Sequence, residues 1–320
     1  MLELPLAHYR FHFRALEAVR LPDFAGSAWR GAFGNSLRRL LCATRLSHCD
    51  SCPLVGTCAF PYLFEGRRPP HATVLSGFER VCVPYALRPG NRGRIELAEG
   101  AAAVLDMALF GRANDRLVYI VHALQAAALQ GIGPGRGRLE LKRAHRLAGL
   151  GETEGEAVFA QGTFQQPGPA SPPKLRFGEA AALAIRLESP LRLKSAGKLV
   201  TPEALTAPHF IEACIRRISA LAAFHAPAPI EADYARLKTL AALVSLGRGD
   251  LRWLDWKRFS RRQGQRMAIG GIIGDFVLEL PEEARELLPW IELAQWAGVG
   301  KSASMGLGQF RILSGGEAES

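Results

Sequence analysis

The chain has 320 residues, 48% of them hydrophobic, which suits one large domain or two of ordinary size around a real core. Its 40 basic and 30 acidic residues give a formal net charge of +10, a balance that favours a polyanionic partner, with nucleic acid ahead of an anionic membrane. The sequence has no signal-peptide core and no apolar run of membrane-spanning length, so we expect a cytoplasmic protein with no membrane partner.

The first half of the chain reads as strand, helix, strand, strand, helix, glycine-rich loop and strand. Alternating or extended patterns predict strands at residues 7–20, 78–87, 93–110 and 138–146. Helical periodicity predicts helices at residues 26–41 and 114–130, the first beginning at Gly26-Ser27 with Trp29, Phe33 and Leu37 on one face. Gly, Pro and Gln then enrich residues 149–173, so we predict a linker or excursion over residues 149–180.

The second half repeats this order. Strands are predicted at residues 182–193, 251–260, 265–280 and 307–313, and helices at residues 203–224, 231–246 and 282–296. Each half therefore ends with a helix, a glycine-rich loop and a strand, which indicates a diverged duplication.

The sequence predicts an α+β fold with two tandem ferredoxin-like (RRM-like, βαββαβ) domains. The first spans residues 1–148 with a cysteine-rich metal-binding insertion at 42–66, and the second spans residues 181–320 with a glycine-rich loop at 298–308. Such a fold offers an open sheet and basic crevices, which RNA-binding modules use.

The C-terminal glycine-rich loop is predicted to contact phosphate. Successive backbone amides without Cβ atoms can form an anion-binding nest. The sequence is not a nucleotide-binding P-loop, because that motif needs a glycine where Gln295 stands. The predicted contacts are Gly298, Gly300, Lys301, Ser302, Gly306 and Gly308; the alternative is a glycine-rich turn without a ligand.

Four cysteines form a C-x6-C-x2-C-x5-C pattern at Cys42, Cys49, Cys52 and Cys58. Four soft ligands this close in a cytosolic chain indicate a metal. We expect a structural Zn²⁺ that stabilises the loop, while a 4Fe–4S cluster stays open because the C-x2-C-x5-C portion resembles iron–sulfur sites of some nucleases. The alternative is four free buried thiols.

Three blocks carry a family resemblance: Leu21 to Gly34 with Arg38-Arg39, Trp256 to Gln263 leading to Met267–Gly274, and Gly298 to Phe310. The stretch Ser189–Lys194 before Arg216-Arg217 adds to them. Together they resemble the CRISPR endoribonucleases of the RAMP superfamily that process precursor RNA, the "Cas six" proteins, in the branch with a cysteine-containing N-terminal insertion.

This resemblance implies tandem ferredoxin-like domains that bind CRISPR repeat RNA and cut the precursor transcript, often at the base of a hairpin, in antiviral defence. It further implies that the product, crRNA, is often retained and that catalysis needs no metal or other cofactor. Other CRISPR effector subunits are possible partners, and we expect a monomer or homodimer. A non-catalytic crRNA-binding subunit of a CRISPR effector complex is the alternative.

Metal-free cleavage uses the 2′-hydroxyl beside the scissile phosphate and leaves a 2′,3′-cyclic phosphate and a 5′-hydroxyl. Many relatives carry a catalytic histidine near the first helix, but residues 21–41 contain none, so we choose His48, with Tyr9 and Ser27 as acid or orienting groups. Besides the glycine-rich loop, the expected RNA contacts are Arg38, Arg39, Lys257, Arg258, Arg261 and Arg262.

Overall fold

The computed structural model describes residues 2–68, 80–90, 93–255, 257–260 and 265–313. The chain divides into two compact units. Residues 3–172 and 220–229 form the N-terminal unit, and residues 173–219 with those from 230 onward form the C-terminal unit. The first unit thus contains residues 149–172, which the sequence predicts as part of a linker.

A single antiparallel sheet organises the N-terminal unit, with strand order β3-β5-β1-β6-β7-β8. Its strands are β1 (Leu6–Ala15), β3 (Tyr85–Pro89), β5 (Ala102–Phe110), β6 (Leu139–Leu147), β7 (Gly155–Ala160) and β8 (Thr163–Phe164). A separate ribbon pairs β2 (Val19–Leu21) with β4 (Ile95–Leu97). The order of β3, β5, β1 and β6 is that of a ferredoxin-like βαββαβ unit.

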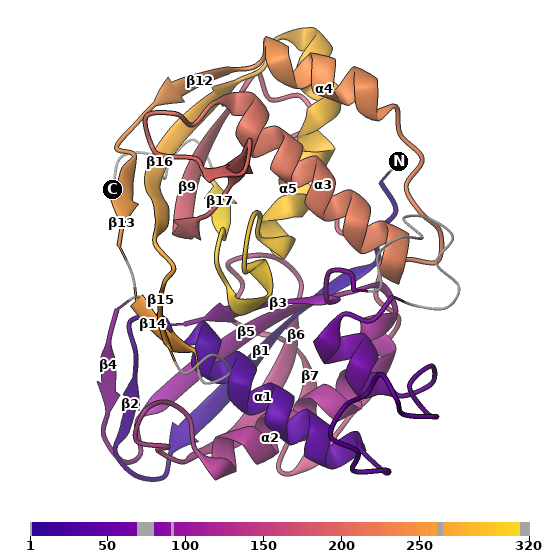
Figure 1. Ribbon diagram of the computed structural model, residues 1–320, viewed down its shortest axis with the longest axis vertical. Helices are drawn as coiled ribbons and strands as arrows, with labels where there is room; N and C mark the ends of the chain where they lie inside the picture. Colours follow the sequence, from indigo (N-terminus) through magenta and orange to yellow (C-terminus); the bar gives the residue numbers. More distant parts are fainter. Residues whose placement is uncertain (1, 69–79, 91–92, 256, 261–264, 314–320) are drawn as a thin grey trace. The chain divides into compact units, whose positions relative to one another are not determined.

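Two helices cover one face of this sheet, α1 (Gly26–Leu41) and α2 (Leu117–Gln130), and Figure 1 shows them side by side. The short 3₁₀-helix η2 (Gly111–Arg116) leads into α2. Trp29, Phe33 and Leu37 recur every fourth residue along α1 and are fully buried. The Trp29 ring lies 4.9 Å from that of Phe13 on β1, and burying each such side chain contributes roughly 1.5–3 kcal/mol.

Residues 155–164 differ from the sequence prediction, because they form the hairpin of β7 and β8 rather than an irregular linker. The strand β7 pairs with β6 and buries Val158 and Phe159 against the core. The residue composition did not indicate these strands, because Gly- and Pro-rich segments flank them on both sides.

The C-terminal unit contains a second antiparallel sheet with the order β12-β16-β9-β17, and β13 also pairs with β16. Its strands are β9 (Ala182–Leu191), β12 (Ser245–Arg248), β13 (Arg252–Leu254), β16 (Gly271–Glu279) and β17 (Phe310–Ile312). Two small hairpins pair β10 (Lys194–Ser195) with β11 (Lys198–Leu199) and β14 (Lys257–Ser260) with β15 (Gln265–Ala268).

Three helices belong wholly or largely to this unit: α3 (Ala207–His225), α4 (Tyr234–Leu243) and α5 (Leu288–Ala297), with the 3₁₀-helices η3 (Glu282–Leu287) and η4 (Ala303–Met305). Phe210 of α3 packs between the sheet residues Phe276 and Phe310, with ring centroids 5.1 and 5.0 Å away. The second sheet also has the ferredoxin-like strand order, so the predicted tandem fold is confirmed. Within the described residues, no helix is both long and apolar enough to cross a membrane.

Candidate functional site

The C-terminal end of α1 is tied to the cysteine insertion through Arg38. Its Nη2 donates hydrogen bonds to the carbonyl oxygens of Leu46 and Ser47, the latter at 2.7 Å. The guanidinium carbon also lies 5.8 Å from the centroid of the Phe60 ring. Arg38 therefore holds the backbone directly before His48, and its contact with RNA stays a prediction.

His48 and the four cysteines line one small cavity in the insertion, with a volume of about 30 Å³. The imidazole belongs to an exposed residue, whereas the cysteines are half-buried and unpaired with one another. Tight turns shape this loop: the Cys52 N–H donates to the Cys49 carbonyl at 3.0 Å. Among the described residues, no three His, Cys, Asp or Glu side chains are arranged to hold one metal ion.

The other two predicted catalytic residues do not join His48. Tyr9 lies in the core at 1% exposure, and its hydroxyl donates to Asn114 Oδ1 at 3.1 Å. Burial also raises the pKa of the Tyr9 phenol, so this side chain packs and does not exchange protons with a substrate. Ser27 stands in the first turn of α1, eleven residues before Arg38, or about 16 Å along a helix axis.

The face of the first sheet opposite the helices carries a cluster that sequence reasoning missed. The pairing of β1 with β6 places His12 opposite Arg143 and Arg10 opposite His145. Arg14 follows two residues after His12 along β1. The His12 and His145 rings are 5.4 Å apart in an edge-on arrangement. Burial lowers the pKa of His12, and the charges of Arg143 and His145 lower it further. Alternation in residues 8–14 could have indicated the β1 half of this cluster.

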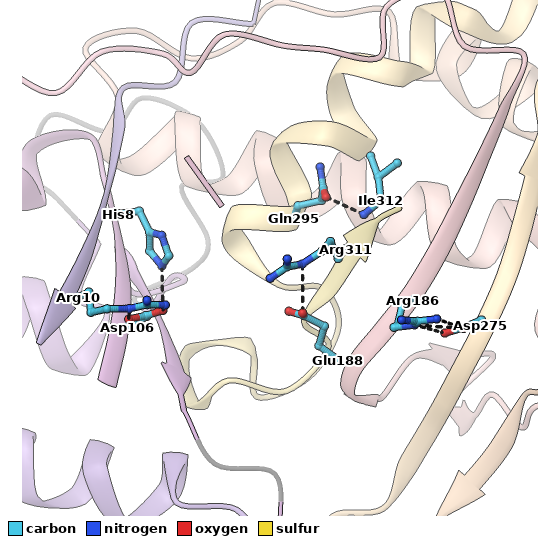
Figure 2. A network of polar contacts seen from close by, with 9 residues as sticks. All are labelled: His8, Arg10, Asp106, Arg186, Glu188, Asp275, Gln295, Arg311 and Ile312. Carbon is cyan, nitrogen blue, oxygen red and sulfur yellow. Dashed lines mark hydrogen bonds and ion pairs between the residues drawn. The ribbon is translucent and has the colours of Figure 1, made fainter. Parts of the chain in front are cut away.

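The same sheet face buries His8 beside the Arg10–Asp106 ion pair (Figure 2). Arg10 donates two hydrogen bonds to the Asp106 carboxylate at 2.8 and 2.7 Å, and His8 Nε2 lies 3.9 Å from Asp106 Oδ2. Burial lowers the pKa of His8 from 6.5 to about 4, because the pull of Asp106 is offset by the nearby charges of Arg88 and Arg10.

We expect the buried His8 to make folding stability depend on pH. The folded-state pKa is below the unfolded value, so the unfolded chain binds more protons between pH 6.5 and about 4. Stability should therefore fall on acidification, by about 2 kcal/mol from this group between pH 7 and pH 5. Urea unfolding of the wild type and of His8→Gln at both values checks this; equal pH slopes for the two proteins would contradict it.

The glycine-rich loop of the C-terminal unit is confirmed as a sharply turning segment. Gly298, Gly300, Gly306 and Gly308 all have positive φ, between 62° and 92°, which glycine adopts without strain. Lys301 and Gly300 are exposed at its tip, while Gly306 and Gly308 are buried.

The loop's amides differ from the expected anion nest, because most of them already have protein partners. The Val299 N–H donates to the Gly308 carbonyl at 2.9 Å, and the Lys301 N–H donates to Arg192 at 2.9 Å. The Gly308 N–H donates to the Pro190 carbonyl at 3.0 Å. The loop is thus fastened to the end of β9, and its tip carries the exposed Lys301 and the half-exposed Ser302, whose contact with RNA stays a prediction.

Polar contacts hold the strands and helix around this loop (Figure 2). Gln295 of α5 is buried and accepts a hydrogen bond from the Ile312 N–H at 2.7 Å. On β17, Arg311 pairs with Glu188 at 3.3 Å. The residue that breaks the P-loop motif, Gln295, therefore joins the helix before the loop to the strand after it.

The remaining predicted RNA contacts lie elsewhere. Arg39 is exposed, and its Nη1 donates to Gln130 Oε1 at 2.9 Å, linking the ends of α1 and α2. Lys257 and Arg258 are paired by backbone register with Ala268 and Met267 in the β14–β15 hairpin. Arg261 and Arg262 lie outside the described residues.

Comparisons with known proteins agree with this two-unit division. Residues 4–170 match the family model AF_1859_N, described as an N-terminal domain. Residues 185–310 match the model CRISPR_Cas6, described as CRISPR-associated endoribonuclease Cas6. An uncharacterized protein from Archaeoglobus fulgidus is 22% identical over 299 residues, which cover 92% of this chain and 93% of that protein.

Solved structures share the fold across nearly the whole chain. The "Cas6 (TTHB231) product complex" has a TM-score of 0.58 at 19% identity, covering 97% of this chain and 99% of the other. A structure of Thermus thermophilus Cas6 (TTHB231) has a TM-score of 0.52 at 17% identity, with 97% and 99% covered. A partial Cas6-RT-Cas1–Cas2 complex has a TM-score of 0.58 at 14% identity, covering 97% of this chain and 46% of that one.

Two ferredoxin-like units in tandem, the second ending in a glycine-rich loop, define a double RRM-like protein. Within that class, the chain belongs to the family whose N-terminal domain is AF_1859_N, and its C-terminal unit matches the family model of the CRISPR-associated endoribonuclease Cas6.

Proposed function

We propose that this protein cleaves CRISPR repeat RNA within the precursor transcript by a metal-independent reaction. The match of residues 185–310 to the model of the CRISPR-associated endoribonuclease Cas6 supports the reaction class, namely RNA cleavage by an endoribonuclease. The observation that carries the mechanism is the placement of His48, an exposed imidazole whose preceding backbone is held by Arg38 at the end of α1. An imidazole so presented can act as a general base toward a bound substrate.

In the proposed reaction, His48 removes the proton of the 2′-hydroxyl as that oxygen attacks the adjacent phosphorus. The bond from phosphorus to the 5′-oxygen breaks, and the leaving oxygen takes up a proton. The products are a 2′,3′-cyclic phosphate and a 5′-hydroxyl. Guanidinium or ammonium groups stabilise the extra negative charge of the pentavalent state, and Arg39 and Lys301 are exposed candidates.

A second histidine supports an alternative site for the same reaction. His12 sits on a rigid strand beside Arg143 and His145, and its lowered pKa favours the neutral form that a base requires. Its side chain is only partly exposed, however, and His145 is 8% exposed. Substrate access therefore favours His48.

The test is cleavage of a hairpin-bearing repeat RNA by the purified protein in EDTA, followed by analysis of the product ends. We expect a single cut with a 2′,3′-cyclic phosphate on the upstream fragment. Tight binding without cleavage would instead assign the protein as a non-catalytic crRNA-binding subunit. Products with a 3′-hydroxyl and a 5′-phosphate would exclude attack by the 2′-oxygen.

Partners of two kinds follow from the proposal: the repeat RNA with its crRNA product, and other CRISPR proteins. Similar chains have been solved as a product complex and within a Cas6-RT-Cas1–Cas2 complex. The net charge of +10 suits the first kind of partner, because binding a polyanion releases its condensed counterions.

The cysteine insertion is proposed to bind a structural Zn²⁺, with a 4Fe–4S cluster as the alternative. All four thiols line one cavity, and thiolates are the donors that both groups prefer. Cys42, Cys49, Cys52 and Cys58 would hold the metal. The bound metal would stabilise the insertion loop and take no part in RNA cleavage.

We expect protein purified without oxygen to contain one zinc per chain and to lack the broad visible absorbance of an iron–sulfur cluster. Cys49→Ser with Cys52→Ser should lose the metal and lower Tm, whereas Cys82→Ser should retain the metal. Elemental analysis and thermal unfolding of the three proteins provide the check. Metal-free wild-type protein whose Tm is unchanged by added zinc or by iron–sulfur reconstitution would refute the proposal.

A further inference from the structure

An arginine-lined cavity lies beside the cysteine insertion in the N-terminal unit, with a volume of about 230 Å³. Three segments contribute to its lining: the insertion, the residues of and after the π-helical turn η1 (Pro61–Glu65), and η2 before α2. The polar and charged side chains that define it are Tyr62, Arg67, Arg68, Arg112, Asp115 and Arg116.

Positive charge dominates this cavity, because four guanidinium groups face one carboxylate. Two of the arginines are fixed by the surrounding protein. Arg67 Nη1 lies 2.9 Å from Asp50 Oδ1, and Arg112 Nη2 donates to the Phe224 carbonyl at 3.3 Å. Arg116 is exposed at the end of η2. Planar guanidinium groups arranged in this way match the oxygens of a phosphate.

Tyr62 provides a second, independent indication of a ligand. Its hydroxyl oxygen is buried and has no hydrogen-bond partner in the part of the chain that the structure describes. The Tyr62 ring packs against His225 with the centroids 5.5 Å apart, which limits the movement of the phenol. Buried hydroxyl groups in folded proteins almost always have a partner, so a ligand oxygen in the cavity would supply the missing one.

We propose that this cavity binds one phosphodiester group of the RNA substrate. The volume is below the roughly 300 Å³ at which pockets for whole small molecules begin, so it suits a phosphate group with its sugar. Val55 and Cys58 line both this cavity and the one that contains His48, so the two share a wall. The bound phosphate is thereby held next to the insertion, which deepens the proposed function and rests on it.

The test compares two double variants that remove the same charge. Arg68→Ala with Arg116→Ala alters the cavity, whereas Arg94→Ala with Arg252→Ala removes two exposed arginines outside it. Fluorescence anisotropy with labelled repeat RNA over a series of salt concentrations gives affinity and salt slope. We expect the cavity variant to bind about tenfold more weakly than the control variant and to lose about one unit of slope.

Tyr62→Phe adds a measurement that keeps the net charge constant, and it should weaken RNA binding without altering the salt slope. Equal affinities and slopes for the two double variants would overturn the cavity proposal, while cleavage by the wild-type protein would still stand. Absence of cleavage by the wild type would overturn the proposed function, whatever the cavity binds. Circular dichroism and Tm of each variant verify that the comparison is made on folded protein.

Discussion

Replacing His48 with alanine is expected to slow cleavage of repeat RNA by about 10²- to 10⁴-fold, the usual contribution of a general base. RNA affinity should change little, because the imidazole is proposed to act on the 2′-hydroxyl and makes no phosphate contact. Single-turnover rates with saturating protein separate the chemical step from binding.

Two matched substitutions make the result specific. His209→Ala removes a histidine at the start of α3 whose Nδ1 lies 3.0 Å from Thr206 Oγ1, and it should leave the rate unchanged. His12→Ala removes the rival base on the face of the first sheet opposite α1 and α2. Full activity in His48→Ala together with a large loss in His12→Ala would move the reaction to the sheet face and refute the assignment of His48.

Arg38 should affect cleavage through His48 rather than through the phosphate. Its guanidinium is engaged with the carbonyl oxygens of Leu46 and Ser47, so it supports the loop that carries the imidazole. A sequence read residue by residue gives no indication of it, since an arginine near a helix end normally interacts with solvent or the helix dipole.

The elements with strong local patterns were predictable from sequence. The Trp29, Phe33 and Leu37 repeat predicted α1 with the bounds that the structure has. Alternation predicted one strand over residues 7–20, which the structure divides into β1 and β2. The hairpin of β7 and β8 was missed because its strands are short and Gly- and Pro-rich segments flank them, although β7 pairs with the preceding strand β6. Strand registry, which depends on such pairings, cannot be read from composition.

The candidate sites were predictable only in part, for the same reason. The cysteine spacing predicted a shared location, and all four thiols do line one cavity. By contrast, the arginine-lined cavity joins Arg67 and Arg68 with Arg112 and Arg116, which are more than forty residues away in sequence. Each of these arginines taken alone resembles an ordinary surface charge, and only the fold reveals their common cavity.

Replacing Gly308 with alanine is expected to destabilise the C-terminal unit by about 3 kcal/mol or more. Gly308 has a φ of 65°, and a Cβ placed there would lie 1.8 Å from the Val299 carbonyl oxygen. That oxygen belongs to the backbone, so it cannot move without breaking the contacts that fasten the loop to β9. The loop between α5 and β17 would have to open, and the ferredoxin-like sheet would lose the support of its last strand.

Gly31→Ala is the matched control, because it makes the same chemical change at a helical position with open space. Nothing lies within 4 Å of a Cβ at Gly31, so alanine should stabilise α1 by about 0.5–1 kcal/mol through its higher helix propensity. Urea unfolding of both variants gives the two free energies. A Gly308→Ala protein as stable as the wild type would mean that the loop adopts a different backbone path, and the presentation of Lys301 at its tip would then need another explanation.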